Sequence, residues 1–500
     1  MNPSRKQELQ ASLKNFLQTP LKKRLQRSQA QNGQAEILEL FQSVSNLVPA
    51  YRAFLTEQQI NPESITDFKQ FASLPPINKK NYIQRYPLDQ LCYQGELTNC
   101  DFVAVSSGST GEPTFWPRSL ADEYEIATRF EQIFFDSFRT DLQSTLAVVC
   151  FSLGTWVGGM YTANCCRHLA AKGYPIAVVT PGSNQAEIFR VLESLAPSFE
   201  QVVLLGYPPF IKDTIDAGVQ KGLDWQQYNI KIVMAGEVFS EEWRNLVAEK
   251  IGSKHPQYDF ASLYGTADAG VLGNETPLSI CIRRFFANNP DLAQDFFGQS
   301  RLPTLVQYDP LSRFFEVEED SLLFSGNNGI PLIRYQIGDT GGIVSYQKML
   351  EYLSLHDFDP VIELQQKRKR GVRELPFVYV FGRADFTLSC YGANIYPENI
   401  QIGLEQPGIR DRVTGKFVME IDADDQANPY LKIAVELGIG TLNSQEIQDA
   451  IAFAIYTQLI RLNSEYANYV PPERQFPTVE LFESGNPKYF PQGVKHRYKR

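Results

Sequence analysis

Residues 103–114 read VAVSSGSTGEPT, a short apolar strand that runs directly into a loop of glycines and small hydroxylated residues. Glycines let a backbone bend closely around an anion because they carry no Cβ atom. The N–H groups exposed in this way, together with serine and threonine hydroxyls, can surround a polyphosphate. No Gly-Lys-Ser/Thr follows the run, so it is not a P-loop, and taken alone it is more typical of an ordinary surface loop. The candidate phosphate-binding residues are Ser106, Ser107, Gly108, Ser109, Thr110 and Gly111.

The elements that would position that loop are indicated by a repeating pattern between about residues 145 and 265. Short β-rich apolar runs alternate there with helix-length amphipathic segments, and Ser240 is the expected N-cap of the segment 240–251. Such alternation predicts parallel βαβ units in a doubly wound sheet. The expected strands are 176–180, 201–205, 231–235 and 258–263.

Each of these strands runs into a turn-rich loop. The loops begin at Pro181, Gly206, Gly236 and Tyr264. In open α/β sheets, ligands bind outside the carboxyl ends of the strands. We therefore expect these four loops and the Ser/Gly loop to converge on one crevice.

The predicted fold class is α/β: a large N-terminal domain with a doubly wound, mostly parallel sheet, and a small mobile C-terminal α+β domain. Residues 300–345 are predicted to form short strands and turns, and a basic polar stretch precedes a new strand at 376–382. The expected division is a helical extension over 1–37, the main domain over 38–381 and a lid domain over 382–500.

Composition narrows the class of protein. The 500 residues carry a net charge of −10, which favours neither nucleic acid nor an anionic membrane as a partner. Residues 1–31 are basic, and a solvated amphipathic helix is the expected structure there, with docking to an acidic partner as the alternative. Seven scattered cysteines without a CxxC pair predict reduced thiols in a cytoplasmic protein. We expect no histidine metal cluster and no membrane span.

Four motifs in order carry a family resemblance: SSGSTGEPT, YGTAD, RYQIGD and GRADFTLSCYGANIYP. This order resembles the adenylate-forming superfamily of acyl-CoA ligases, most closely its phenylacetate-CoA ligase branch. The stretches LPPINKKNYIQRYPL, FSLGTWVGG and AGEVFSEEWR agree with that branch, and the resemblance covers roughly residues 38 to 498.

The resemblance implies an enzyme that joins a carboxylic acid to AMP, releases pyrophosphate and then passes the acyl group to a thiol. It implies ATP and Mg²⁺ as cofactors. In such a reaction fixed donors stabilise the charge that develops on the phosphate oxygens. By resemblance, Ser107, Ser109, Thr110 and Gly111 hold the β- and γ-phosphates, and Asp268 ligates Mg²⁺.

The remaining motif positions imply contacts to the nucleoside. Asp339 would accept hydrogen bonds from both ribose hydroxyls. Arg383 would contact the ribose, and Asp385 would be the hinge pivot on which the C-terminal domain swings between the two steps. The residues expected beside the adenine are Gly236, Glu237 and Tyr264, and further expected nucleotide-binding residues are Gly265 and Thr266.

Three positions depart from the family pattern. Glu112 stands where many relatives have lysine, and Ala267 stands where a phosphate-contacting serine or threonine is usual, with Thr266 as a substitute. Val494 interrupts the expected Gly-Lys pair near the C-terminus, so the adenylation lysine is expected at Lys495, with Lys488 as the fallback. A basic solvated tail is the other interpretation of this segment.

The acyl pocket and the acceptor are less closely specified. Trp156, Tyr207 and Phe239 are candidate walls for a planar or medium-length apolar acid, although such residues are equally compatible with core packing. Coenzyme A is the default acceptor, and a carrier-protein phosphopantetheine, an amine or another nucleophile are alternatives. The oligomeric state, a homodimer included, stays open. A hypothesis of another class is a nucleotide-binding protein with impaired catalysis.

Overall fold

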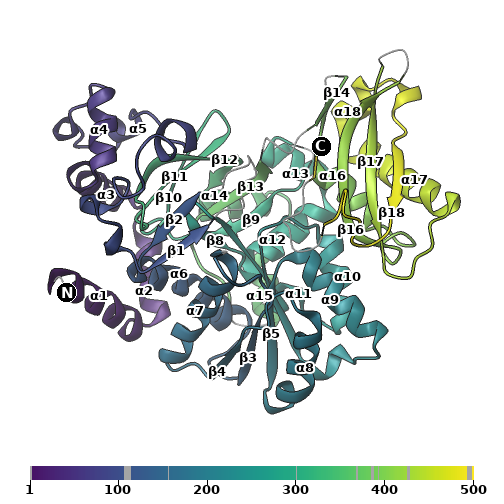
Figure 1. Cartoon of the computed structure of the whole chain (residues 1–500), viewed down its shortest axis with the longest axis horizontal. Helices are drawn as coiled ribbons and strands as arrows, with labels where there is room; N and C mark the ends of the chain where they lie inside the picture. The colour runs from purple at the N-terminus through teal and green to yellow at the C-terminus, as the bar shows by residue number, and fades with distance from the viewer. Residues whose placement is uncertain are drawn as a thin grey trace.

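The structure is a computed structural model of the 500-residue chain. It describes residues 3–105, 114–155, 157–299, 301–367, 370–383, 388–391, 393–424, 428–491 and 498–499. Eleven of the described strands form one sheet in the order β10-β11-β12-β13-β9-β8-β7-β6-β5-β3-β4 (Figure 1). A three-stranded sheet, β16-β17-β18, lies in the C-terminal part of the chain.

The predicted βαβ units form one half of the large sheet, where β4, β3, β5, β6 and β7 pair in parallel. Their bounds are β3 Thr145–Val149, β4 Ile176–Val179, β5 Gln201–Gly206, β6 Ile230–Ala235 and β7 Phe260–Thr266. The α/β fold class predicted from the sequence is confirmed.

The other half of the sheet is antiparallel. It starts where β7 turns back into β8 after three residues, because a parallel connection needs a crossover of a dozen residues or more. The strands are β8 Gly270–Asn274, β9 Thr304–Gln307, β10 Phe314–Glu318, β11 Ser321–Gly326, β12 Leu332–Val344 and β13 Phe377–Arg383.

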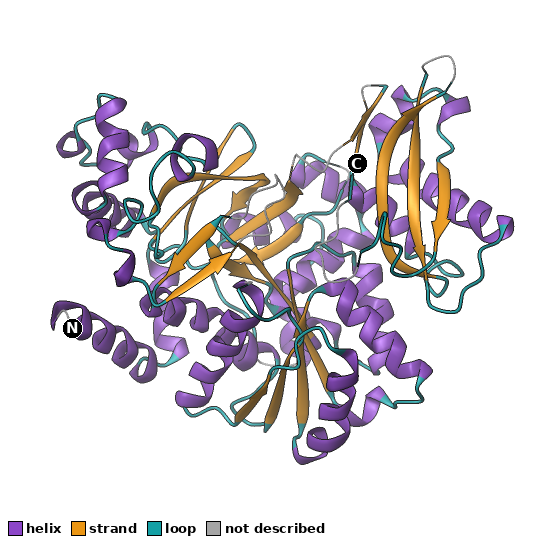
Figure 2. Cartoon of the chain, in the orientation of Figure 1, coloured by secondary structure: helices purple, strands orange, loops and turns teal. Residues whose placement is uncertain are grey.

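Helices cover both faces of the parallel half (Figure 2). Leu146 and Val148 of β3 join the apolar cluster under α8, α9 and α10, whereas Ala147 and Val149 join the cluster under α6 and α7. This division follows from the alternation of side chains along a strand, and it confirms the doubly wound arrangement. Ser240 caps α10 as predicted, accepting a hydrogen bond from the Trp243 N–H at 2.9 Å. These helices are α6 Leu120–Gln132, α7 Val157–Ala171, α8 Gln185–Leu195, α9 Pro208–Gln220 and α10 Glu241–Ile251.

The antiparallel half is also covered on both faces. Val306 of β9 packs into the cluster of α3, α4 and α5, whereas its neighbour Leu305 packs into the cluster of α12, α13, α14 and α15. The short helix α11 Pro256–Asp259 adds Tyr258 to the second of these clusters. The other helices are α3 Gln34–Leu47, α4 Pro49–Glu57, α5 Phe68–Ala72, α12 Pro277–Asn288, α13 Pro290–Phe297, α14 Tyr346–Ser354 and α15 Pro360–Lys367.

A two-stranded hairpin carries the Ser/Gly loop. Strands β1 Phe102–Val105 and β2 Phe115–Arg118 pair antiparallel, with Val105 opposite Phe115. The predicted short strand before the loop is therefore confirmed. Residues 106–113, which join the two strands, lie outside the described residues.

The C-terminal part has its own apolar core beside the large sheet (Figure 1). Ile400 of α16 and Ile455 of α17 pack on buried residues of β16 and β17, such as Phe417 and Ile433. Its elements are β14 Leu388–Cys390, β15 Ala393–Ile395, α16 Pro397–Leu404, β16 Val413–Ala423, β17 Pro429–Leu437, α17 Gln445–Leu462, α18 Ser464–Tyr469 and β18 Thr478–Phe482.

The basic N-terminal segment forms helices, but these are docked on the protein rather than simply solvated. Helices α1 Pro3–Gln18 and α2 Leu21–Ala30 bury Phe16, Leu21 and Leu25. The Phe16 ring stacks on Tyr124 with a centroid distance of 5.7 Å. One basic residue of this segment pairs with an acidic residue of the same chain: Arg24 forms a 2.8 Å ion pair with Glu125. The expectation of a solvated helix is therefore wrong at these positions.

All seven cysteines lie within the described residues, where none of them forms a disulfide, and the reduced state of their thiols stays a prediction. Cys165 and Cys166 are buried on α7. Among the described helices, none has both the length and the apolar character that crossing a membrane requires. The described residues also contain no cluster of three or more histidine, cysteine, aspartate or glutamate side chains suited to a metal ion.

Replacing Phe16 with alanine should lower the free energy of unfolding by about 3–5 kcal/mol, because the fully buried ring would leave a cavity. Thermal and urea unfolding measure this change. Leu13→Ala is the matched control on the same helix, since Leu13 is 37% exposed. Equal, small effects of both substitutions would contradict the docking of α1.

Candidate active site

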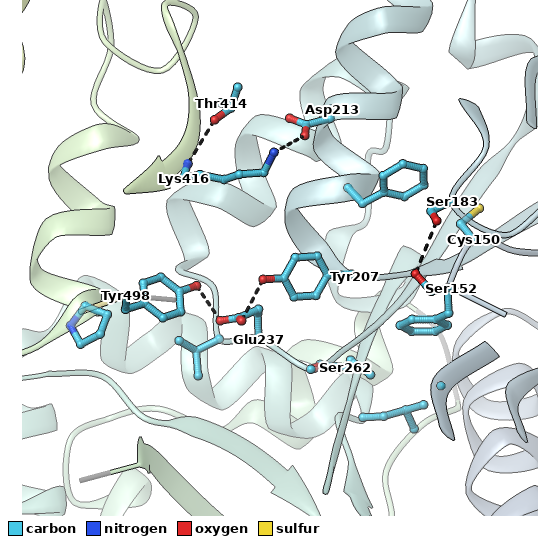
Figure 3. Close-up of a pocket in the computed structure, with 18 of the residues that line it drawn as sticks. Cys150, Ser152, Ser183, Tyr207, Asp213, Glu237, Ser262, Thr414, Lys416 and Tyr498 are labelled. Carbon is cyan, nitrogen blue, oxygen red and sulfur yellow. Dashed lines mark hydrogen bonds and ion pairs between the residues drawn. The ribbon is translucent and has the colours of Figure 1, made fainter. Parts of the chain in front are cut away.

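A cleft of about 2870 Å³ opens at the carboxyl edge of the parallel strands and extends to the C-terminal domain. Ser183 follows β4, Tyr207 follows β5 and Glu237 follows β6, and all three line the cleft (Figure 3). Tyr264, near the end of β7, lines it as well. Val105, at the end of β1, lines it too. The predicted convergence is confirmed for the four loops that follow the parallel strands, whereas residues 106–113 of the Ser/Gly loop lie outside the described residues.

Most predicted nucleotide-binding positions that the structure describes lie on this cleft. They are Gly236, Glu237, Tyr264, Gly265, Thr266, Asp268 and Asp339. Arg383 is the last residue of β13, where its backbone lies opposite Asp339 of β12. The predictions that fall outside the described residues are Ser106, Ser107, Gly108, Ser109, Thr110, Gly111, Trp156, Asp385 and Lys495.

Tyr264 and Asp339 form a partly buried pair. The Tyr264 hydroxyl donates a hydrogen bond to Asp339 Oδ2 at 2.7 Å. The Tyr264 ring stacks on Phe315 with a centroid distance of 6.4 Å, and Asp339 is only 6% exposed. The contact fixes a carboxylate beside an aromatic ring on the wall of the cleft.

Asp268 is held by groups that the sequence motifs did not single out. Its Oδ2 accepts a hydrogen bond from the Tyr335 hydroxyl at 2.5 Å, and its Oδ1 lies 3.7 Å from Lys79 Nζ. The carboxylate lines the cleft, so its chemistry suits Mg²⁺, which is usually held by one or two carboxylates together with phosphate oxygens and water.

Thr266 lines the cleft, and its role as a substitute for Ala267 at the phosphate stays a prediction. Its Oγ1 accepts a hydrogen bond from the Ala269 N–H at 3.0 Å and so closes its own turn. The buried Arg118 guanidinium donates to the Ala267 carbonyl on the same turn. The side chain of Thr266 is therefore engaged in fixing the loop that carries Asp268.

Glu237 accepts hydrogen bonds on both carboxylate oxygens. The Tyr207 hydroxyl donates to Oε1 at 2.8 Å, and the Tyr498 hydroxyl donates to Oε2 at 2.5 Å (Figure 3). Burial, reinforced by the adjacent Glu237 charge, raises the pKa of Tyr207 well above its usual value, so the hydroxyl stays protonated. Gly236 has φ of +92°, a conformation that favours glycine and leaves the backbone uncovered beside the cleft.

Phe239 does not line this cleft. Its ring packs against Trp243 with a centroid distance of 5.1 Å, near the guanidinium groups of Arg244 and Arg283. It borders a separate cavity of about 70 Å³. The expectation that Phe239 forms a pocket wall is corrected, because α10 begins two residues later and draws this side chain into the core.

Comparison with known proteins finds no matching protein-family profile and no matching curated protein. Solved structures do match. 2-Hydroxyisobutyryl-CoA ligase in the postadenylation state with R3-HIB-AMP has a TM-score of 0.62 at 14% identity, over 93% of this chain and 87% of that chain. The same ligase in an open conformation with 2-HIB-AMP and CoA has a TM-score of 0.51 at 14% identity, over 93% and 90%.

This chain shares the fold of 2-hydroxyisobutyryl-CoA ligase. The comparison does not test the resemblance to the phenylacetate-CoA ligase branch, which stays a prediction. In this ligase fold the cleft described above lies between the large sheet and the C-terminal domain.

The sequence motifs assigned no role to three residues that line the cleft or bind one of its carboxylates. Lys79 and Tyr335 lie within stretches that carried the resemblance, LPPINKKNY and RYQIGD, so the motifs included them without indicating a role. Tyr498 contacts a residue 261 positions away, and no local pattern indicates that contact. Lys488, the fallback lysine, also lines the cleft.

The two domains of the ligase fold also meet through Ser240 and Glu405. The Ser240 hydroxyl, at the start of α10, donates to the carboxylate of Glu405, which follows α16. Burial raises the pKa of the Glu405 carboxyl to about 8, Ser240 and Lys212 lower it, and the nearby Glu242 charge raises it. At neutral pH this interface therefore favours the protonated form of Glu405.

Glu405→Gln should remove a pH dependence of stability. Protons bind more tightly to the folded state, so the contribution of Glu405 is complete below the unfolded pKa of about 4.3 and is lost as pH rises toward 8. Urea unfolding between about pH 5 and pH 9 should show wild type losing stability relative to the variant. The exposed Glu483 gives a control, Glu483→Gln, that should leave the profile unchanged. Parallel profiles for wild type and Glu405→Gln would contradict the assignment.

Proposed function

We propose that this protein uses ATP to activate a carboxylic acid as an acyl-adenylate and then transfers the acyl group to a thiol, with coenzyme A as the acceptor. The observation that carries the proposal is the convergence of Tyr264, Asp268 and Asp339 on one cleft. The fold supports it, because the matched ligase structures hold an acyl-AMP, and one also holds CoA. A carrier-protein phosphopantetheine or an amine is the alternative acceptor.

The nucleoside would lie along the ends of β6 and β7. Asp339 offers two acceptor oxygens to the ribose hydroxyls, and its bond from Tyr264 fixes its orientation. The Tyr264 ring would flank the adenine, which would lie against the exposed backbone of Gly236. Arg383, opposite Asp339 in the sheet register, would add a ribose contact.

The triphosphate would lie toward the Ser/Gly loop between β1 and β2. Ser107, Ser109, Thr110 and Gly111 would supply hydroxyl and N–H donors there. Asp268 would hold Mg²⁺, which neutralises phosphate charge when bound. Lys79, 3.7 Å from Asp268, adds a positive charge at the same wall.

The first step forms a bond between a substrate carboxylate oxygen and the α-phosphorus and breaks the bond to the β-phosphate oxygen, so pyrophosphate leaves. We propose that Lys495 stabilises the negative charge that develops on the phosphate oxygens in this step. Lys488, on the cleft wall, is the alternative. In the second step the thiol sulfur attacks the acyl carbon and AMP leaves. We propose that the C-terminal domain, residues 382–500, pivots at Asp385 between these steps.

The acid would occupy the cleft beside the ends of β3 and β5. Phe130, Val157, Tyr161 and Tyr207 line this part of the cleft, which suits a planar or medium-length apolar acid. Trp156 adjoins Val157 in the sequence and stays a candidate wall. Seven cysteines at irregular spacing, with no disulfide among the described residues, fit a reducing compartment such as the cytoplasm.

A panel of carboxylic acids tests the function. With ATP and Mg²⁺, at least one planar or medium-length apolar acid should cause pyrophosphate release, and mass spectrometry should detect its coenzyme A thioester only when coenzyme A is added. A product formed with an amine instead would change the acceptor. ATP binding without pyrophosphate release for any acid would favour the impaired nucleotide-binding protein that Glu112, Ala267 and Val494 suggest.

Asp339→Asn should raise the ATP concentration needed for half-maximal rate by about 10-fold to 100-fold, because a charged acceptor for the ribose is lost. Steady-state kinetics with varied ATP measure this effect. Asp295→Asn is the matched control, since Asp295 also accepts a tyrosine hydroxyl, from Tyr352 at 2.8 Å, but lies on α13 away from the cleft. An unchanged ATP requirement in Asp339→Asn would refute the ribose assignment.

A further inference from the structure

The hydrogen bond between Tyr498 and Glu237 joins two separately packed parts of the molecule. Glu237 follows β6 of the large sheet, and Tyr498 lies near the C-terminus. The bond is 2.5 Å long, and Tyr498 is only 7% exposed. Figure 3 shows the two tyrosine hydroxyls, of Tyr207 and Tyr498, approaching the Glu237 carboxylate from the two parts.

Tyr498 moves with the C-terminal domain. Its carbonyl accepts a hydrogen bond from the Met419 N–H at 2.7 Å, and Lys499 forms a parallel bridge with the same residue of β16. Its ring packs on Phe417 with a centroid distance of 5.2 Å. Because Phe417 and Met419 belong to the core of that domain, a rotation of the domain would carry Tyr498 with it.

Glu237 is fixed on the other side. The Tyr207 hydroxyl holds its second oxygen at 2.8 Å, and both residues follow neighbouring parallel strands. A hydrogen bond weakens steeply once its atoms separate beyond about 3.5 Å. The Tyr498 contact therefore exists in only one narrow range of domain orientations.

The ion pair between Lys416 and Asp213, which also joins the domains, is a weaker candidate for this selection. Lys416 Nζ of β16 lies 3.3 Å from Asp213 Oδ2 of α9, but the two side chains are 27% and 24% exposed. Partly exposed ion pairs contribute little and tolerate small displacements. The Tyr498 bond is more buried and reaches the loop that we assign to the adenine.

We propose that Tyr498 is a positioning residue: its bond to Glu237 holds the C-terminal domain in the described orientation, and it must break before acyl transfer. We assign this orientation to acid activation because Lys488, a candidate adenylation lysine of the C-terminal domain, lines the cleft in it. This inference rests on the proposed function. A contact made in one of two orientations shifts their populations by its own free energy. Loss of the hydroxyl should therefore slow the first half-reaction and leave the second unchanged or faster.

The test compares full-length wild type with Tyr498→Phe in each half-reaction separately. Single-turnover pyrophosphate release measures activation, and addition of coenzyme A to preformed enzyme-bound acyl-adenylate measures transfer. The ratio of activation to transfer rates should fall about tenfold or more in the variant. Tyr430→Phe is the matched control, because the Tyr430 hydroxyl donates to Asp422 within the C-terminal domain at 3.3 Å.

A second readout needs no activity. Amide hydrogen exchange of residues 413–419 and 236–239 should be faster in Tyr498→Phe than in Tyr430→Phe, because the two parts separate more often. Unchanged exchange would overturn the role of the bond whatever the activity.

The kinetic outcomes distinguish a failure of the positioning role from a failure of the proposed function. If wild type releases pyrophosphate and both half-reactions slow equally in Tyr498→Phe, the residue is merely structural and the positioning role is overturned. An unchanged ratio overturns it as well. If wild type releases no pyrophosphate with any acid, the proposed function itself is rejected, and with it the assignment of the bond to acid activation.

Discussion

Parallel strands must all end at the same edge of their sheet, and the candidate site depends on that constraint. Residues after β4, β5 and β6, and at the end of β7, are far apart along the chain, yet they line one cleft. The antiparallel half of the sheet then adds Asp339 from β12. The hydrogen bond from Tyr264 to Asp339 joins the two halves at the point where a nucleoside would lie.

The carboxylates of this cleft share a second feature, which is that tyrosine hydroxyls hold them. Tyr335 donates to Asp268, Tyr264 to Asp339, and Tyr207 and Tyr498 to Glu237. A phenol orients a carboxylate without bringing a positive charge, so these contacts leave the carboxylates able to attract a cation or to accept from a sugar hydroxyl. Positive charge near Asp268 comes instead from Lys79, whose Nζ lies 3.7 Å from Asp268 Oδ1.

Local patterns predicted the secondary structure well where the apolar residues follow a single strand or helix period. The strands and helices between residues 145 and 265 occur where the apolar periodicity indicates them, down to the Ser240 cap. The same kind of pattern did not indicate what the N-terminal helices pack against. Phe16, Leu21 and Leu25 give only a weak apolar face, and the surface that buries them is formed by residues more than a hundred positions later.

The sequence by itself determined the α/β class, the parallel core and the set of loops at its carboxyl edge, because these follow from local periodicity and from strand geometry. It also supplied Tyr264, Asp268 and Asp339 through short motifs. Only the tertiary structure decided that Phe239 packs in the core, that Thr266 closes its own turn, and that Tyr498 reaches Glu237. Each of these depends on which distant groups compete for one hydrogen bond or one buried space, and that competition is settled only when the chain is folded.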